Sequence, residues 1–239
     1  MSRGLSFGPA ADLYDAIRPS YPAAALEWAL GAPPRRVVDL GAGTGILTRA
    51  LLGLGYQVVP VEPDEAMCAK LAARTPGAVP LAGRAEAVPL ADGQADAVVA
   101  GQAYHWFDQD ATHREAARVL RPGGVFAPIW NIRDNDVPWV RELSAIAGSV
   151  RNNHGGVFNG EIDHDFGPAF GPVERAHFRH EVPMTADRLV MLMASRSYYI
   201  TATPERQASI EAAIRDLAAR LPEHFALPYV TIAYRAGRS

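Results

Sequence analysis

A glycine-rich turn between a buried strand and a helix constrains this chain more than any other feature of its sequence. Residues 35–40 are typical of a buried parallel strand, and residues 46–52 continue with the apolar pattern of a helix. Gly41, Gly43 and Gly45 lie between them. Because glycine lacks a Cβ atom, the backbone can take positive φ and a ligand can lie against the main chain. The pattern indicates a nucleotide site at the carboxyl end of the first strand.

The spacing of the glycines distinguishes between nucleotides. A dinucleotide loop needs a third small residue where the helix meets the strand, and this chain has Ile46 there. Asp39 comes just before the glycines, and its carboxylate would repel a pyrophosphate and attract a cation. S-adenosylmethionine offers a sulfonium and an ammonium group and no phosphate. This cofactor therefore fits the turn better than a nicotinamide dinucleotide.

An acidic residue ends the next predicted strand. Glu62 follows the apolar run at 56–61, about 20 residues past the glycines, where an acid accepts hydrogen bonds from ribose hydroxyls. This position fits the nucleoside of either cofactor.

Further segments extend the glycine motif into an ordered series. This series resembles the motifs of class I S-adenosylmethionine-dependent methyltransferases of the small-molecule type, in residues 37–45, 61–67, 83–90, 95–108 and 121–125. The third of these segments resembles the adenine loop of the family, and the fourth resembles its fourth strand with the exit from that strand. Five motifs in order are more specific than the glycine turn alone.

The resemblance implies an α/β fold: a Rossmann-like seven-stranded sheet, mostly parallel with an antiparallel last strand, and helices on both faces. It implies one methyltransferase domain over residues 1–239, divided into an N-terminal lid (1–34), a cofactor-binding core (35–131), an insertion (137–170) and a C-terminal substrate-side part (171–239). Periodicity predicts helices at 10–17, 23–30, 65–74, 111–120, 137–150, 186–195 and 204–221, and strands at 78–82, 125–131, 173–182 and 225–234. Pro80 places the strand at 78–82 at an edge of the sheet.

The cofactor site follows from the motifs and from the chemistry of the side chains. Its predicted residues are Tyr14, Arg18, Asp39, Gly41, Ala42, Gly43, Gly45, Glu62, Pro63, Met67, Ala85, Glu86 and Gln102. Arg18 would pair with the cofactor carboxylate and Tyr14 would line the sulfonium, unless the two simply pack on one helix face. Arg84 stands where the family commonly has Asp, so backbone groups of Ala85 and Glu86 would contact the adenine.

The predicted acceptor side is aromatic and lies at the exits of the fourth and fifth strands. Its candidates are His105, Trp106, Trp130 and Tyr198. His105 has an ordinary pKa near 6.5 and could serve as a general base for the acceptor. The alternative is a histidine that orients a neighbour or packs a wall.

Composition limits the remaining function classes. A formal net charge of −3 predicts no nucleic-acid partner, since such binding needs clustered Lys and Arg. The single cysteine, Cys68, and the lack of a signal pattern or membrane-length apolar run favour a cytoplasmic protein with no membrane partner, either a monomer or a homodimer. The spacing of His154 and His164 fits no zinc pattern, so no metal is expected.

Three other functions compete with methyl transfer to a small acceptor. A nicotinamide-dependent oxidoreductase is opposed by Ile46 and Asp39. A non-catalytic sensor or partner subunit that kept the fold and binds the cofactor stays open. A nucleic-acid methyltransferase would need a basic surface and a base-holding Asn-Pro-Pro-Tyr type motif after the fourth strand, which this sequence lacks.

Overall fold

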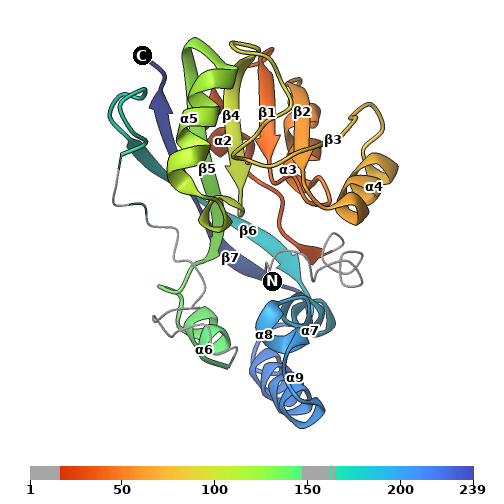
Figure 1. Ribbon diagram of the computed structural model, residues 1–239. Helices are drawn as coiled ribbons and strands as arrows, with labels where there is room; N and C mark the ends of the chain where they lie inside the picture. The colour runs from red at the N-terminus through yellow and green to blue at the C-terminus, as the bar shows by residue number, and fades with distance from the viewer. Residues whose placement is uncertain (1–16, 147–161, 163–164) are drawn as a thin grey trace.

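The computed structural model describes residues 17–146, 162 and 165–239, and this part is built on one seven-stranded sheet (Figure 1). Its strand order is β3-β2-β1-β4-β5-β7-β6. The strands are β1 (Arg36–Leu40), β2 (Gln57–Glu62), β3 (Leu81–Ala82), β4 (Ala95–Gly101), β5 (Leu120–Arg133), β6 (Glu174–Met184) and β7 (Phe225–Gly237). Strands β1 to β5 run parallel, and β7 lies between β5 and β6 antiparallel to both. The predicted Rossmann-like sheet with an inserted antiparallel last strand is confirmed.

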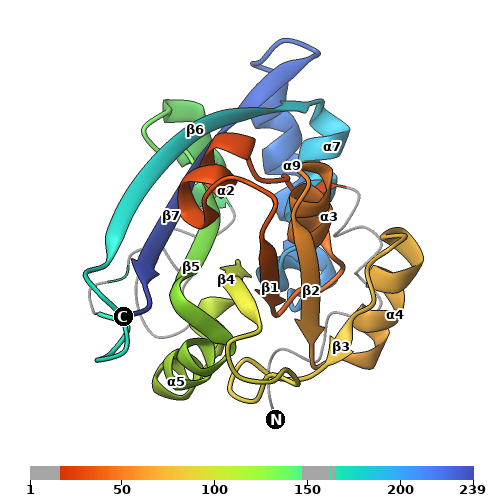
Figure 2. The ribbon, with the colours of Figure 1, turned by 90° about the horizontal axis from the view of Figure 1, so that it is seen from above.

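Helices cover both faces of the sheet (Figure 2). They are α2 (Ala23–Leu30), α3 (Ile46–Gly53), α4 (Glu65–Arg74), α5 (Gln109–Val119), α6 (Pro138–Ile146), α7 (Ala186–Ala194), α8 (Ser197–Ile200) and α9 (Pro204–Ala218), with a short 3-10 turn, η2 (Tyr104–Trp106). Helices α2 and α3 pack on one face, and α5 packs on the other. The helix predicted at 10–17 lies outside the described residues, apart from Ile17.

The two faces of the sheet are separated by the alternation of side chains along its central strands. In β1, Val37 belongs to the apolar cluster under α2 and α3, whereas Val38 belongs to the cluster under α5. In β4, Val98 and Val99 divide in the same way. Because successive strand residues point to opposite faces, a parallel strand covered on both sides is apolar throughout. This explains why these strands were recognisable in the sequence.

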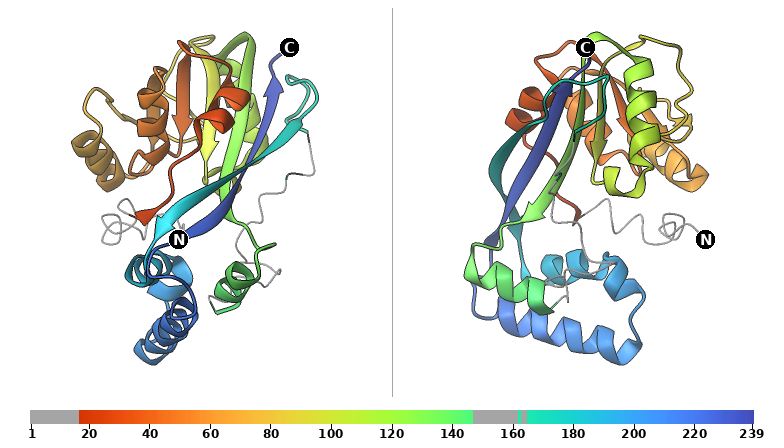
Figure 3. Two further views of the ribbon diagram at one scale, coloured as in Figure 1. Left: turned by 180° about the vertical axis from the view of Figure 1, so that it is seen from behind. Right: turned by 60° about the vertical axis from the view of Figure 1, so that its left-hand side comes forward.

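A third apolar cluster lies beyond the carboxyl ends of the parallel strands (Figures 1 and 3). Helices α6, α7 and α9 enclose it with side chains such as Leu143, Leu189, Leu192 and Ile214, all fully buried. We call the four helices α6 to α9 the helical cap. The predicted insertion and the predicted C-terminal part therefore contribute to the same cap, since α6 comes from the first and α7 to α9 come from the second.

Two boundaries differ from the sequence-based expectation for identifiable reasons. The motif at 121–125 resembles the turn before the fifth strand of the family, but in this structure it is part of β5. The pairing of β5 with β4 shifts register between Ala95 and Ala97. Gly123 makes this possible with a φ of 75°. The edge strand predicted at 78–82 is reduced to Leu81 and Ala82, because Pro80 cannot donate a hydrogen bond to the ladder.

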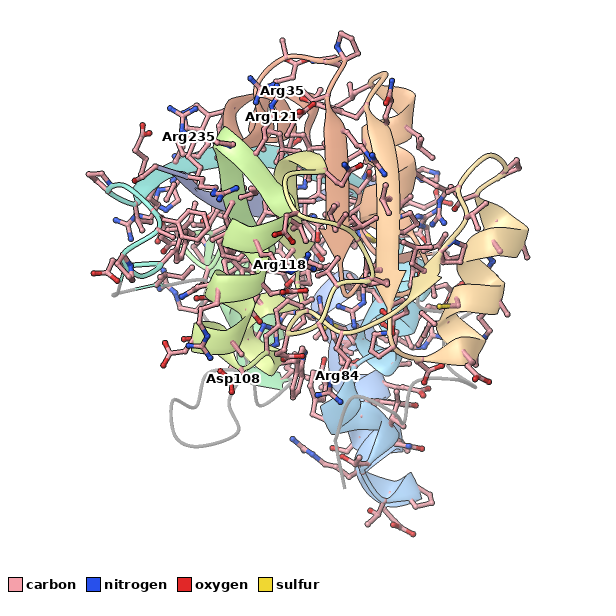
Figure 4. All side chains as sticks on the ribbon, turned by 45° about the horizontal axis from the view of Figure 1, so that its top comes forward. Arg35, Arg84, Asp108, Arg118, Arg121 and Arg235 are labelled. Atoms are coloured by element: carbon pink, nitrogen blue, oxygen red, sulfur yellow. The ribbon has the colours of Figure 1, made fainter. Side chains whose placement is uncertain are left out.

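The loop at 83–94 is fixed to helix α5 through Arg118 (Figure 4). Its guanidinium donates to the carbonyl oxygens of Leu90 at 2.8 Å and Val88 at 3.0 Å. Glu115 accepts the Val88 amide at 2.6 Å and pairs with the same guanidinium at 2.7 Å. At the far end of α5, the Glu86 carboxylate accepts the Asp108 amide at 3.0 Å. The loop that follows β3 is thereby held at two points.

In the described part of the chain, no helix combines the length and the apolar character that crossing a lipid bilayer requires.

Replacing Arg118 tests whether these contacts hold the loop. Arg118→Met removes the donors to two carbonyl groups, so we expect a loss of about 1 to 2 kcal/mol in the free energy of unfolding. Faster amide hydrogen exchange should appear at residues 85–92. Arg121→Met is the matched control, because Arg121 is 57% exposed and bonds only Asp96 among the described contacts. Equal effects of the two variants would contradict the role of Arg118.

Candidate functional site

A pocket opens at the carboxyl ends of β1 and β4, beneath the helical cap. Its empty space of about 550 Å³ includes open solvent at the mouth. The described residues that line it are Arg18, Pro19, Tyr21, Asp39, Gly41, Ala42, Gly43, Thr44, Ile46, Leu47, Gly101, Gln102, Asn131 and Arg196. Six of the predicted site residues thus meet here: Arg18, Asp39, Gly41, Ala42, Gly43 and Gln102.

The three glycines of the turn have different surroundings although all take positive φ. A Cβ atom on Gly41 would lie 2.9 Å from the Cβ of Ala103, and one on Gly45 would lie 2.8 Å from the Cγ of Leu71. A Cβ on Gly43 would meet no atom of the described residues within 4 Å. Gly41 and Gly45 are therefore needed for close packing inside the protein, whereas Gly43 leaves open space where a ligand can approach the backbone.

Glu62 fixes the shape of this turn from the end of β2. One carboxylate oxygen accepts the Gly43 amide at 2.8 Å, and the other accepts the Asp64 amide at 3.0 Å. Glu62 is buried, and burial raises the pKa of its carboxyl group. A carboxylate can accept about four hydrogen bonds, so two further donors could still be bound. Glu62 lies behind Gly43 and is not itself part of the pocket lining.

Asp39 is a buried carboxyl group in the pocket wall. It is 1% exposed and accepts the hydroxyl of Thr48 at 2.7 Å. Burial, with a further contribution from the charge of Glu62, raises the pKa of Asp39 to about 7. A cation in the pocket would stabilise the ionised form of this group.

Gln102 and Asn131 join the strand ends to the N-terminal segment. Gln102 takes a φ of 57°, which is uncommon for a residue other than glycine, and its side chain donates to the Asn131 carbonyl at 2.7 Å. The Asn131 amide donates to the Ser20 carbonyl at 3.0 Å and accepts the hydroxyl of Thr231 at 2.6 Å. Asn131 was missing from the predicted site, although a polar residue at the end of an apolar strand was a usable signal.

Two arginines lie at the mouth of the pocket. Arg18 donates to the carbonyl of Ser195 at 3.4 Å, which joins the N-terminal segment to the end of α7. Arg196 is the next residue of the cap. Arg196 was not among the predicted site residues, because nothing in its local sequence indicates that it lines the same pocket as the glycine turn. Tyr14 lies outside the described residues.

The structure does not support the prediction that Trp130 forms a wall of the acceptor site. Trp130 is 1% exposed and packs edge-on against Tyr104 and Tyr234 inside the aromatic core. It is held there because the strand alternation of β5 turns it away from the pocket and into the layer under α5.

His105 also lies outside the pocket lining. The indole N–H of Trp130 donates to its Nδ1 atom at 3.4 Å, so the neutral ring carries its proton on Nε2. Burial lowers the pKa of His105 to about 4. A group with this pKa is a weak base at neutral pH, and its surroundings favour the alternative of a histidine that packs and orients a neighbour.

The other predicted residues surround the site without lining it. Trp106 is 59% exposed, and the Tyr198 hydroxyl contacts the sulfur of Met193 at 3.6 Å. Met67 is half-buried at the start of α4, where the Asp64 side chain caps the helix, and Pro63 is exposed. Gly45, Glu62, Ala85 and Glu86 are also absent from the pocket lining, although Gly45 lies between the lining residues Thr44 and Ile46.

No group of three or more His, Cys, Asp or Glu side chains in the described ranges is arranged to hold a metal ion. His154 and His164 fall in the parts that the structure does not describe.

Comparisons with known proteins agree with this architecture. Residues 38–127 match the family model described as a methyltransferase domain. An uncharacterized methyltransferase of Mycobacterium tuberculosis is 42% identical over 240 residues, which cover 97% of this chain and 95% of the relative. An uncharacterized methyltransferase-like protein of Schizosaccharomyces pombe is 30% identical over 232 residues, which cover 92% of this chain and 91% of the relative.

A solved structure shows the same likeness. The putative type II methyltransferase from Anaeromyxobacter dehalogenans superimposes with a TM-score of 0.65 at 27% identity, over 92% of this chain and 97% of that one. The glycine turn, the sheet order and the likeness to relatives over nearly the whole chain lead to one conclusion. This chain belongs to the class I S-adenosylmethionine-dependent methyltransferases.

Proposed function

We propose that the pocket holds S-adenosylmethionine with its methionine end toward Arg18 and its ribose toward Glu62, and that the acceptor is a small molecule. One observation carries this proposal: the described residues leave open space at Gly43, whose amide is bonded by the buried Glu62, while the buried Asp39 lines the same pocket. This exposed backbone together with Asp39 and Glu62, which we call the cofactor bed, suits a cationic nucleoside without phosphate.

The residues present fit this cofactor. Asp39 would face its positively charged end, and the unused lone pairs of Glu62 would accept the ribose hydroxyls. The loop with Ala85 would border the adenine, held in place by Glu86 and Arg118. A dinucleotide would have to bring its pyrophosphate near Asp39, which opposes the nicotinamide alternative.

The cofactor supplies an already activated methyl group, so the main task of the protein is positioning. Holding two reactants in line can lower a barrier by about 7 to 11 kcal/mol. Asn131 and Gln102 fix the segment at Pro19 and Ser20 over the strand ends, where an acceptor would enter. His105 would accept the indole N–H of Trp130, help to fix that side chain in the aromatic core, and would not take a proton.

A panel of small acceptors, assayed for demethylated cofactor, tests the proposed reaction. Turnover of a small acceptor supports it. Tight cofactor binding with no turnover on the whole panel would favour the non-catalytic sensor, and binding of a nicotinamide dinucleotide in place of the adenosyl cofactor would overturn the assignment.

Gly43→Ala tests the cofactor bed. The new Cβ meets no atom of the described part of the chain, so the expected cost to folding is that of the positive φ, about 1 to 2 kcal/mol. Within the pocket the methyl group would occupy space that the cofactor needs, and we expect at least a tenfold weaker Kd by calorimetry, or about 1.4 kcal/mol.

Gly93→Ala is the matched control for this variant. Gly93 has a φ of 65° and open space around it, but it lies outside the pocket lining. It should show the same small loss of stability with an unchanged Kd. Equal affinity of the two variants would mean that the cofactor does not lie against Gly43.

The pKa of Asp39 predicts how cofactor affinity depends on pH. Below about pH 7 the free protein holds Asp39 protonated, and a cationic ligand must displace that proton. Affinity should therefore fall as pH falls below about 7, by up to about tenfold per pH unit, and should level off above it. Asp39→Asn should remove this dependence. Calorimetry between about pH 5 and pH 8 measures it, and a pH-independent Kd in the wild type would contradict it.

His105→Ala separates positioning from base catalysis. Loss of a general base costs about 100- to 10,000-fold in rate, whereas we expect kcat to fall by less than about tenfold. The pH profile of kcat should keep its shape. A loss of two or more powers of ten at unchanged KM, together with a lost inflection in that profile, would restore His105 as the base.

A further inference from the structure

The charges around the pocket do not balance once the cofactor is considered. Among the described residues of its lining, Arg18 and Arg196 are cationic and Asp39 is the one acid. S-adenosylmethionine itself carries a sulfonium, an ammonium and a carboxylate group. With the cofactor bound and Asp39 ionised, the described lining has two positive charges in excess, and one is still in excess when an ionised Glu62 beside Gly43 is counted.

Arg196 lies between helices α7 and α8 of the helical cap and lines the pocket. It follows the last turn of α7, where its backbone amide donates to the carbonyl of Met193 at 3.1 Å. Its Nε atom is buried and has no hydrogen-bond partner within the described part of the chain. Buried donors of this kind normally have an acceptor, and a guanidinium is suited to bind an oxyanion through two parallel hydrogen bonds.

A second guanidinium lies close enough to interact electrostatically with the first. Arg133, at the end of β5, donates to the hydroxyl of Ser144 at 3.2 Å and to the sulfur of Met193 at 3.4 Å. Burial, and then the charge of Arg196, lower the pKa of Arg133. Two like charges are thus held near each other in a place of low solvent access. An anion beside Arg196 would relieve this repulsion.

Resting on the proposed function, we propose that the acceptor carries an oxyanion, a carboxylate or a phosphate, which Arg196 binds while Arg18 takes the carboxylate of the cofactor. Each arginine would then bind a different substrate: Arg196 the acceptor and Arg18 the cofactor. The guanidinium of Arg18 donates to the carbonyl of Ser195, so it lies close to the backbone of Arg196.

The binding of small probes to protein loaded with S-adenosylhomocysteine tests this assignment. The probes are phenylacetate, glutarate and phenyl phosphate, with neutral phenylacetamide for comparison. We expect at least one anion to bind about 10- to 100-fold more tightly than the amide, and Arg196→Gln to abolish that difference. Whether the carboxylates or the phosphate ester bind best identifies the anion.

Two control variants accompany Arg196→Gln. Arg188→Gln removes a cation from the exposed side of α7, the helix that precedes Arg196, and should leave every Kd unchanged. Arg196→Lys keeps the charge and should retain part of the preference for anions, which shows that the cap is still folded.

The cofactor itself provides the decisive comparison, because 5′-methylthioadenosine lacks the amino-acid part of S-adenosylhomocysteine. Arg18→Gln should weaken only S-adenosylhomocysteine, whereas Arg196→Gln should weaken neither. If Arg196→Gln selectively weakens S-adenosylhomocysteine, Arg196 binds the cofactor carboxylate and the inference is overturned.

The remaining outcomes separate this inference from the proposed function. Equal binding of anions and amide, or no binding of any probe to the loaded protein, overturns the anionic acceptor and leaves methyl transfer in place. Failure of the wild type to bind either adenosyl compound overturns the proposed function itself.

Discussion

The burial of two carboxyl groups beside the glycine turn is the constraint on which the site depends. Asp39 and Glu62 end neighbouring parallel strands, and ionised groups are costly in a protein interior unless they are hydrogen-bonded. The Thr48 hydroxyl bonds the first, and the backbone amides of Gly43 and Asp64 bond the second. These bonds also set the path of the turn. The proposed preference of the pocket for a cationic ligand rests on these two acids, whose position the small net charge of the whole chain does not reveal.

The fold assigns different parts of the site to different layers. The parallel strands supply the proposed cofactor bed, and the segment after α7 supplies Arg196 to the pocket lining. Between them lies the segment at Pro19 and Ser20, bonded to Asn131. Because Asn131 is bonded in turn by Thr231 of β7, the inserted antiparallel strand supports the entrance to the pocket.

The aromatic cluster after β4 shows how a sequence can suggest chemistry that packing explains. Tyr104 bonds the buried His113 at 2.7 Å, and Trp130 bonds His105. Polar atoms carried into a core need partners, and aromatic residues with histidines provide them while filling space. A histidine at a strand exit is therefore weak evidence for a base until its hydrogen bonds and its burial are known.

The sequence by itself determined the sheet, the glycine turn and the chemical character of its two acids, because these depend on neighbours close along the chain. Strand alternation, the lack of side chains at 41, 43 and 45, and the cap at Asp64 are all local. Only the tertiary structure decided which residues meet across the pocket. Arg18 and Ser195 are 177 positions apart, and their contact depends on how α7 packs beyond the strand ends. It also decided that Trp130 points into the core and that Gly43 alone of the three glycines faces open space, since both follow from packing between elements that no local pattern records.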